Sequence, residues 1–454
     1  MTSFSSALPL AAFRVLLALT AYTGNMLFQL DFTGAYLQKK VPADTKIYVR
    51  AAPGYPEYVV DKWGRRVEAV YELGAYIYGL QEAGAEWQQE LSLWFTESGG
   101  FTRSWVEPNL YYRDGSSGRI WVGVYVDDLL ISAPTKRDHE GFVAQLASRF
   151  VFTDGGEAHH FLGANISRPS KHVVQISHTG YIRRMMSLFP RGVRESGKLS
   201  ETPSSAHLKK LIDELDDTKS VRSVDPALVQ EYRKVVGSSL YSTCAVRPDA
   251  SYAVGQLCRC LTYPDARALT EAYRVLQYLA DSQTLTLTFD GTKGLHILAY
   301  TDADWDAKPS TTGYIIMVCG GPVAWKSVKQ RCVTMSSACE AELVAANAAG
   351  GECVYIRNLV TDLMGFDIPT PPLQVPEMKC DNQGTIDFSR NPASLGRMKH
   401  LERSYLKIRE WLSGKLFSLS HVTTKRNIAD CFTKSLCPSL FTKLRQQFMY
   451  EAQA

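Results

Sequence analysis

The sharpest pattern of apolar and polar positions in this chain lies near residue 125. β-Branched and aromatic residues fill Ile120–Val126 and Leu129–Ser132, and Asp127–Asp128 stands between these two runs. Runs of this length and composition predict strands, and the acidic pair between them predicts a turn. We therefore expect a β-hairpin that carries two adjacent carboxylates at its tip.

The residues before this hairpin predict a helix followed by a strand. Apolar residues dominate Leu8–Tyr22, with Pro9 in the first turn and Gly24 just past the end, which is typical of a helix. A short apolar run in Met26–Gln38 ends at Asp31 and predicts a strand. Further helices are predicted at Glu86–Ser98, at His139–Phe150 and over most of Val229–Leu287.

A second set of elements begins after Gly294. The stretch LHILAYTDADWD predicts a strand that ends at Asp302 and Asp304, and a hairpin is predicted around Gly320–Gly321 between strands Thr312–Val318 and Val323–Ser327. The remaining pattern predicts strands at Arg331–Met335, Glu377–Cys380 and Lys415–Val422, and helices at Ser337–Met364, at Lys399–Leu412 and from near Asn427.

Acidic residues at strand ends suggest chemistry in the first set of elements. Asp127 and Asp128 repel each other unless a proton or a cation lies between them, and an oxygen-binding ion such as Mg²⁺ suits the pair. If the strand that ends at Asp31 lies beside the hairpin, three carboxylates meet at one end of a sheet. Such a set could hold two metal ions about 4 Å apart for phosphoryl transfer. For the hairpin alone, a solvated acidic turn remains the alternative.

These motifs resemble the palm of a reverse transcriptase. A strand ending in Asp31 and the sequence YVDD at Tyr125–Asp128, followed by LLI, are similar to the Ty1/copia class of retrotransposons. The resemblance implies that Asp31, Asp127 and Asp128 bind metal and that Tyr36 is the aromatic gate that excludes a ribose 2′-hydroxyl. From the residues alone, an ordinary core aromatic is the preferred interpretation of Tyr36.

One segment departs from the family pattern. Relatives read close to YGLKQAPRAW, and this chain keeps Tyr78-Gly79-Leu80, Ala83 and Trp87. It has Gln81, Glu82, Gly84 and Ala85 where the family has Lys, Gln, Pro and Arg. Since this segment contacts nucleotide and template in relatives, the resemblance implies a weakened polymerase.

The second set of elements follows the order of the ribonuclease H fold. That chemistry needs acids on the first strand, on the first helix, after the fourth strand and on the last helix, and these places hold Asp302, Glu342, Asp381 and Asp430. The stretches TDADW, SSACEAELVAA, CDNQ and NIADCFTK resemble copia-type ribonuclease H motifs. Glu342 is preferred to Glu340 because Leu343-Val344-Ala345 follow it, as they follow the catalytic acid in relatives.

A further motif of this half, Met398-Lys399-His400, is similar to the family's TKH segment, with Met in place of Thr. His400 either assists product release or caps a helix.

Composition is that of an ordinary globular protein, and it sets limits on compartment and partners. The 454 residues are 45% hydrophobic and 21% charged, and the net charge of +4 permits a nucleic-acid partner without requiring one. The ten cysteines all lie from Cys244 onward without a C-x-x-C pair, which indicates reduced thiols of an intracellular protein. Arg14 interrupts the apolar N-terminal stretch, so neither a signal peptide nor a membrane span is expected.

We expect an α+β and α/β chain in which a reverse-transcriptase palm, with partial fingers and thumb, precedes a connection segment and a ribonuclease H-like domain. The polar stretch Glu195–Asp225 predicts a linker with one short helix. The expected domain boundaries are 1–190 for the palm with partial fingers and thumb start, 191–228 for the linker, 229–292 for the helical connection, 293–440 for the ribonuclease H-like domain and 441–454 for the tail.

The resemblance implies an RNA-directed DNA polymerase with ribonuclease H activity, using two Mg²⁺ ions per site, with Mn²⁺ as the alternative ion. The implied partners are an RNA template, a DNA primer, an RNA–DNA hybrid and deoxynucleoside triphosphates, in the cytoplasm or else in the nucleus or virus-like particles. Protease, integrase and gag segments have no counterpart in the sequence, so we expect an N-terminally truncated copy with incomplete fingers. Two alternatives remain: only the ribonuclease H is active, or the chain is a non-catalytic nucleic-acid-binding relic.

Overall fold

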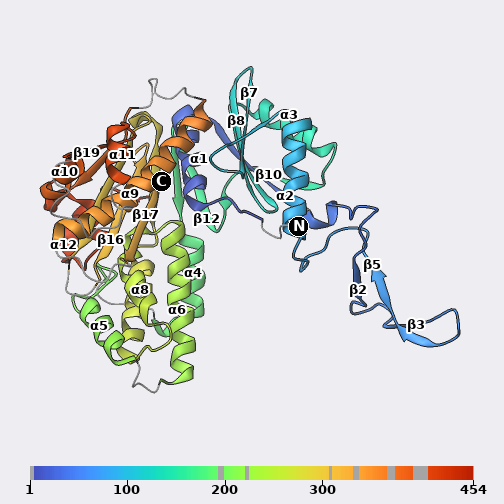
Figure 1. Cartoon of the computed structure of the whole chain (residues 1–454), viewed down its shortest axis with the longest axis horizontal. Coiled ribbons are helices and arrows are strands. Elements are labelled where there is room, and N and C mark those ends of the chain that lie inside the picture. The colour runs from blue at the N-terminus through green and yellow to red at the C-terminus, as the bar shows by residue number, and fades with distance from the viewer. Residues whose placement is uncertain are drawn as a thin grey trace. The chain divides into compact units, whose positions relative to one another are not determined.

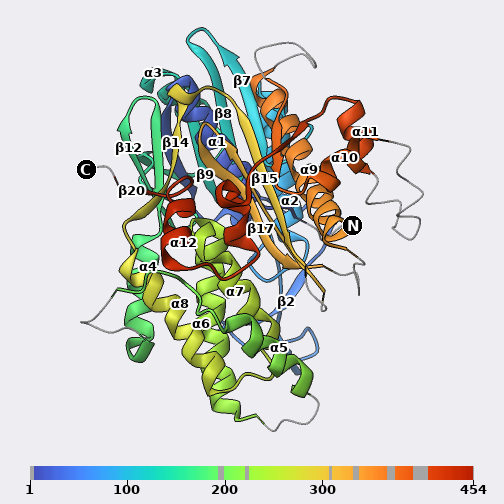
Figure 2. The same ribbon diagram turned by 90° about the vertical axis from the view of Figure 1, so that its left-hand side faces the viewer.

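The computed structural model describes residues 5–192, 199–219, 224–305, 309–330, 337–365, 374–391 and 407–452. The chain divides into two compact units, drawn from two sides in Figures 1 and 2. The first unit comprises Met1–Leu8 and Met26–Glu157, and the second comprises Pro9–Asn25 and Ala158–Ala454. The predicted N-terminal helix therefore belongs to the second unit, although the strand that follows it belongs to the first.

The first unit is built on an antiparallel sheet with strand order β10-β1-β9-β8-β7-β6. The predicted hairpin is formed by β8 and β9, and β1 pairs with β9 on one side and with β10 on the other. The bounds are β1 (Met26–Phe32), β6 (Thr102–Arg103), β7 (Leu110–Gly115), β8 (Gly118–Tyr125), β9 (Asp128–Ala133) and β10 (Phe152–Glu157).

Two helices pack on this sheet, and aromatic side chains fill the core between them and the strands. Helix α2 (Ala83–Leu93) starts three residues before the predicted Glu86 and continues as a π-helical turn, Trp94–Ser98. Helix α3 (Lys136–Ala147) starts at Thr135, whose hydroxyl accepts a hydrogen bond from the Asp138 N–H. The buried cluster between helices and sheet includes Phe28, Phe32, Trp87, Phe95, Phe142 and Phe150.

A ribbon of short strands extends from the same unit between β1 and α2 (Figure 1). Strand β2 (Tyr48–Arg50) pairs with β5 (Val70–Glu72), and β3 (Tyr58–Val60) pairs with β4 (Arg66–Glu68). A 3₁₀ turn, η1 (Ala35–Gln38), joins β1 to this ribbon.

The second unit holds the N-terminal helix α1 (Leu10–Thr23) against two sheets. Arg14 is buried and donates hydrogen bonds to the carbonyl oxygens of Cys244, Ala245 and Val323, which satisfies its guanidinium inside the protein. One sheet has the order β11-β12-β13-β14-β20. Its strands are β11 (His160–Phe161), β12 (Ala164–Ser170), β13 (Val173–Ser177), β14 (Leu285–Asp290) and β20 (Tyr450–Glu451).

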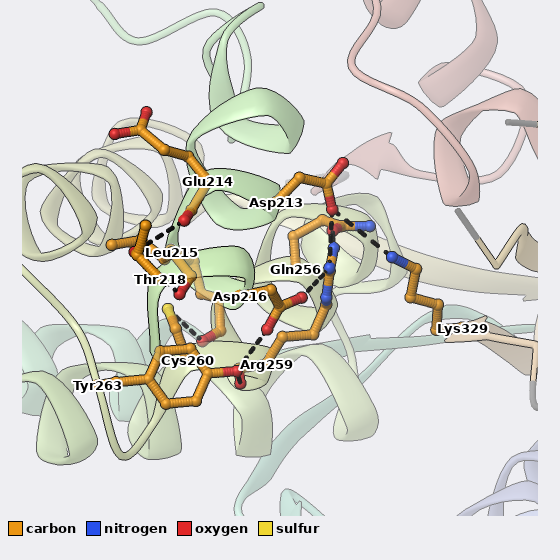
Figure 3. Close-up of polar contacts among 11 residues, drawn as sticks. Asp213, Glu214, Leu215, Asp216, Thr218, Gln256, Arg259, Cys260, Tyr263 and Lys329 are labelled. Carbon is orange, nitrogen blue, oxygen red and sulfur yellow. Dashed lines mark hydrogen bonds and ion pairs between the residues drawn. The ribbon is translucent and has the colours of Figure 1, made fainter. Parts of the chain in front are cut away.

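Most of the described residues between β13 and β14 are helical, in agreement with the pattern of Val229–Leu287. They are α4 (Thr179–Leu188), α5 (Leu208–Thr218), α6 (Pro226–Ala245), α7 (Ser251–Leu257) and α8 (Ala266–Asp281), with a 3₁₀ turn η6 (Cys258–Cys260) after α7. The predicted short helix of the polar stretch is α5. The carboxylates of Asp213 and Asp216 on this helix both form ion pairs with the guanidinium of Arg259, and the Lys329 ammonium lies 3.6 Å from the Asp213 carboxylate (Figure 3).

The second sheet of this unit is mixed and has the order β17-β16-β15-β18-β19. The central strand β15 is antiparallel to β16 and parallel to β18, and β18 is parallel to β19. The bounds are β15 (Ile297–Asp304), β16 (Thr311–Val318), β17 (Gly321–Lys329), β18 (Glu377–Cys380) and β19 (Ser418–His421). The predicted hairpin turn is present, with φ of +50° at Cys319 and +72° at Gly320.

The helices of this half include one, at Gln383–Arg390, that the sequence analysis did not predict, and their boundaries also differ in part from the predicted ones. They are α9 (Ala338–Met364), α10 (Gln383–Arg390), α11 (Lys407–Ser413) and α12 (Pro438–Arg445). The prediction of a last helix that starts near Asn427 and holds Asp430 was wrong in type, because Asp430 lies on a five-residue 3₁₀ helix, η11 (Ile428–Phe432). The predicted strand Arg331–Met335, His400 and the first part of Lys399–Leu412 lie outside the described residues.

Candidate active sites

Asp31 and Asp128 lie directly opposite each other on β1 and β9. Side chains of opposed residues in an antiparallel pair leave the same face of the sheet, with Cβ atoms about 5 Å apart. Asp127 belongs to the turn before β9, and its carbonyl oxygen accepts a hydrogen bond from the Phe32 N–H across 2.8 Å. The structure therefore brings the three acids of the N-terminal motifs to one end of the sheet.

The turn that carries Asp127 is strained and is held by a tryptophan. Val126 has a φ of +57°, a left-handed conformation that costs a β-branched residue about 1–3 kcal/mol. The indole N–H of Trp87 donates a hydrogen bond of 2.9 Å to the Val126 carbonyl oxygen, and its ring packs edge-on against Phe32. The conformation of the turn is thus fixed from the side of helix α2.

The charges at this end of the sheet oppose one another. Burial, together with the carboxylates of Asp127 and Asp31, raises the pKa of Asp128 to about 6. A divalent cation would remove this repulsion, so the donor set fits a metal site. Asp31, Asp127 and Asp128 all lie in the described part of the chain, and their carboxylate oxygens are not all within 4.8 Å of one another. This site is therefore more open than the C-terminal one described below.

Tyr36 lies beside these acids on η1. Its ring centroid is 4.6 Å from that of Tyr78, which comes from the YGL motif. Desolvation, followed by the carboxylate of Asp127 and then by Tyr78, raises the pKa of Tyr36. Its assignment as the aromatic gate stays a prediction, but the position borders the three acids.

The four acids of the C-terminal motifs come from four different elements. Asp302 lies on β15, Glu342 on α9, Asp381 directly after β18 and Asp430 on η11. Because β15 and β18 are parallel neighbours, their carboxyl ends meet at one edge of the sheet. Ligand atoms of Asp302, Asp381 and Asp430 lie within 4.8 Å of one another, and those of Glu342, Cys380 and Asp381 form a second such group.

Hydrogen bonds orient three of these four carboxylates. Thr433 donates its hydroxyl to Asp302, Thr424 donates its hydroxyl to Asp381 across 2.8 Å, and the backbone N–H of Ala303 donates to Glu342. Glu342 belongs to one of the two ligand groups, whereas Glu340 belongs to neither. This arrangement supports the choice of Glu342 made from the sequence.

The position of η11 depends on two contacts with the sheet. Asn427 donates its side-chain N–H to the Thr301 carbonyl oxygen across 3.0 Å and caps η11 through Ala429. Gly313 on β16 lies under η11, and a Cβ there would come within 2.6 Å of Thr433 Cγ2. Only a glycine allows this approach, which places Asp430 beside Asp302.

Like charges crowd this site more tightly than the N-terminal one. Burial raises the pKa of Asp302 and lifts that of Glu342 well above its usual value, and in each case neighbouring acids contribute to the rise. Burial and the carboxylate of Asp302 raise the pKa of Asp430 to about 7. Buried, mutually repelling oxygens are the donors that Mg²⁺ and Mn²⁺ take, so these residues also fit a divalent cation.

Lys434 is a functional residue that the sequence analysis did not single out. Its ammonium lies 2.9 Å from Asp430 and 3.5 Å from Asp302. Burial by itself would lower the pKa of Lys434, but the two carboxylates raise it overall. Thr433 and Cys380 were also missed as site residues. The available signal was position, since Thr433 and Lys434 follow Asp430 by three and four residues within NIADCFTK.

Comparison with known proteins indicates the family of this chain. Residues 2–191 match the family described as reverse transcriptase (RNA-dependent DNA polymerase). The chain is 30% identical to a retrovirus-related Pol polyprotein from transposon RE1 of Arabidopsis thaliana, over 97% of this chain and 28% of that protein. It is 31% identical to a transposon Ty5-1 protein of Saccharomyces cerevisiae, over 70% of this chain and 98% of that protein. A foamy viral protease–reverse transcriptase is similar at 12% identity and a TM-score of 0.44, covering 90% of this chain and 59% of that one.

A palm-type sheet with paired acids followed by a ribonuclease H-like sheet with four acids defines a reverse transcriptase-type protein with a ribonuclease H-like domain. The chain belongs to the reverse transcriptase and ribonuclease H region of the copia-type retrotransposon Pol polyproteins. It spans 28% of the length of the first two curated relatives that it matches. None of the helices that the structure describes has the length and apolar character needed to cross a membrane.

Proposed function

We propose that this chain is an RNA-directed DNA polymerase with a separate ribonuclease H activity. The observation that supports the proposal most strongly is the presence of two sets of carboxylates, one in each compact unit. In each set neighbouring carboxylates raise the pKa of a member, Asp128 in the first set and Asp430 in the second, so each set is poised to accept divalent cations.

In the proposed polymerase site, Asp31, Asp127 and Asp128 would hold two Mg²⁺ ions. When bound, such ions lower the pKa of a primer 3′-hydroxyl and neutralise the leaving pyrophosphate. The protein contributes the orientation of these acids: β1 and β9 hold Asp31 against Asp128, and Trp87 fixes the turn that carries Asp127. Tyr36, beside Asp127, is placed to contact the sugar of an incoming deoxynucleoside triphosphate.

In the proposed ribonuclease H site, Asp302, Glu342, Asp381 and Asp430 would hold the second pair of ions, which activate a water and stabilise the leaving 3′-oxygen when bound. The substrate is the RNA strand of an RNA–DNA hybrid, distinguished by its 2′-hydroxyls and backbone geometry. Lys434 holds Asp302 and Asp430 together and supplies a fixed positive charge.

A second candidate is a chain in which only the ribonuclease H is active. The altered segment Gln81–Ala85 supports it, because an added Cβ at Gly84 would lie 3.7 Å from the Tyr36 hydroxyl, so one of the changed residues is next to Tyr36. The replacement of basic residues by Gln81 and Ala85 removes positive charge from a region that contacts nucleotide and template in the family, and Glu82 adds a negative charge there.

Paired assays on the whole chain with an RNA template, a DNA primer and Mg²⁺ test the proposal. Primer extension should disappear in Asp127→Asn and persist in Asp302→Asn, whereas hybrid cleavage should show the reverse pattern. Cleavage without extension in the unmodified chain would favour the second candidate. Inactivity in both assays with retained hybrid binding would favour a non-catalytic binding protein.

A further inference from the structure

The ribbon formed by β3 and β4 leaves an unusual number of large apolar side chains uncovered. Every residue of Tyr58–Val60 and Arg66–Glu68 is exposed. Trp63, at the tip between the two strands, is 67% exposed. A two-stranded hairpin open on both faces gains little from burial, and exposed aromatic surface of this kind marks an interaction site.

The tip that presents Trp63 is a built turn. The carboxylate of Asp61 accepts hydrogen bonds of 2.9 Å from the backbone N–H groups of Trp63 and Arg65, and Gly64 takes a φ of +79°. Asp61 also pairs with the Arg65 guanidinium at 2.9 Å. The only acid of the tip is therefore engaged by the turn, and the indole of Trp63 is held at the outer end of the ribbon.

Cationic side chains accompany the exposed rings. The Arg66 guanidinium lies 4.2 Å from the ring centroid of Tyr58, and the cationic groups of Lys62 and Arg65 lie 4.4 Å and 4.8 Å from that of Trp63. Residues Val60–Val67 contain one acid, Asp61, and three basic residues, Lys62, Arg65 and Arg66, so the tip carries net positive charge. Aromatic faces with flexible cations beside them complement a ligand that has flat bases and a phosphate backbone.

We propose that the tip of this ribbon binds single-stranded nucleic acid, with bases stacked on Trp63 and Tyr58 and phosphates paired with Lys62 and Arg66. The inference rests on the proposed function, because it places the unpaired part of a nucleic-acid substrate on this chain. Unpaired strands are favoured over duplexes because only unstacked bases offer their faces to aromatic side chains. A second copy of the chain would bury the apolar residues but would bring like charges together.

Fluorescence anisotropy of the whole chain with labelled oligouridylate and oligodeoxythymidylate tests the proposal, with a blunt duplex of equal length as comparison. Trp63→Ala should weaken single-strand binding by about tenfold or more, and Trp63→Phe should retain most of the affinity. Trp105→Ala is the matched control, since Trp105 is 66% exposed in the same unit but lies outside the ribbon. Lys62→Gln combined with Arg66→Gln should reduce the salt dependence by about one to two ions.

Equal single-strand affinities of the unmodified chain and Trp63→Ala would overturn the proposal. So would self-association that Trp63→Ala abolishes without a change in oligonucleotide affinity, because that result assigns the ribbon to a second copy. Asp127→Asn separates this inference from the proposed polymerase: it should lose primer extension and keep single-strand binding. An Asp127→Asn chain that still extends primers would refute the polymerase assignment and leave the binding comparison intact.

Discussion

The indole N–H of Trp87 donates a hydrogen bond to the carbonyl oxygen of Val126 across 2.9 Å, joining helix α2 to the turn between β8 and β9. Val126 has a φ of +57°, and its neighbour Asp127 is one of the three acids at this end of the sheet. The contact explains how the YVDD turn can hold a strained valine, because the buried indole donor satisfies the carbonyl oxygen of Val126. Trp87 is therefore a positioning residue for Asp127 and Asp128.

Trp87→Phe tests this role, because phenylalanine keeps an aromatic ring but removes the donor. The unpaired carbonyl oxygen should cost about 1–3 kcal/mol of stability, and displacement of Asp127 should lower primer extension by about tenfold or more. Steady-state extension and urea unfolding measure the two effects. Trp94→Phe, in the same aromatic core but away from the turn, is the control and should change extension little. Equal extension by both variants would refute the positioning role.

The stability of the metal-free chain should depend on pH through Asp430. Its pKa in the folded protein is about 7, above the usual value for an aspartate, so the folded chain binds this proton more tightly than the unfolded chain. The free energy of unfolding should therefore fall as the pH rises from about 4 to about 7. Asp430→Asn should flatten this dependence and stabilise the metal-free chain above pH 7 by on the order of 1–2 kcal/mol.

Urea unfolding in EDTA across this pH range provides the measurement for Asp430. Asp387→Asn removes an exposed carboxylate from the neighbouring helix α10 and serves as control, with no expected change in slope. A pH dependence that is the same in Asp430→Asn and in the unmodified chain would contradict the electrostatic account of this site.

Lys434→Met should destabilise the chain more without a divalent cation than with one. Removing the ammonium leaves Asp302 and Asp430 to repel each other, which should destabilise the metal-free chain by about 1–3 kcal/mol after allowance for the partial exposure of Lys434. Mg²⁺ should restore more stability to the variant than it adds to the unmodified chain. Thermal unfolding against Mg²⁺ concentration measures the difference. An identical loss at every concentration would show that Lys434 acts only through packing.

Gly313→Ala should impair hybrid cleavage selectively. The added Cβ would lie 2.6 Å from Thr433 Cγ2 and 2.8 Å from Phe432 Cβ, so η11 must shift and carry Asp430 with it. We expect a stability loss of about 1–3 kcal/mol and reduced cleavage, with primer extension preserved because its acids lie in the other unit. Gly237→Ala is the matched control, since a Cβ there meets no atom within 4 Å. Parallel loss of both activities would instead indicate global destabilisation.

Local patterns predicted much of the fold because its elements are long and strongly patterned. The hairpin β8–β9, helix α9 and the turn at Cys319–Gly320 depend on alternation, helical period and turn chemistry, all of which are local. The type of η11 escaped prediction because the contacts that hold its five residues, from Asn427 to Thr301 and over Gly313, involve residues more than 100 positions earlier in the chain. The roles of the seven acids and of Tyr36 stay predictions.

By itself, the sequence determined the strands that carry Asp31, Asp128 and Asp302 and the acidic residues near their ends, because side-chain period and motif spacing are properties of neighbouring positions. Only the tertiary structure decided which acids share a site, because that depends on strand register and parallel pairing between segments far apart in the chain. It also decided that Trp87 supports Val126, that Lys434 enters the acidic cluster and that Trp63 stays exposed. Such contacts follow from packing, which no local pattern records.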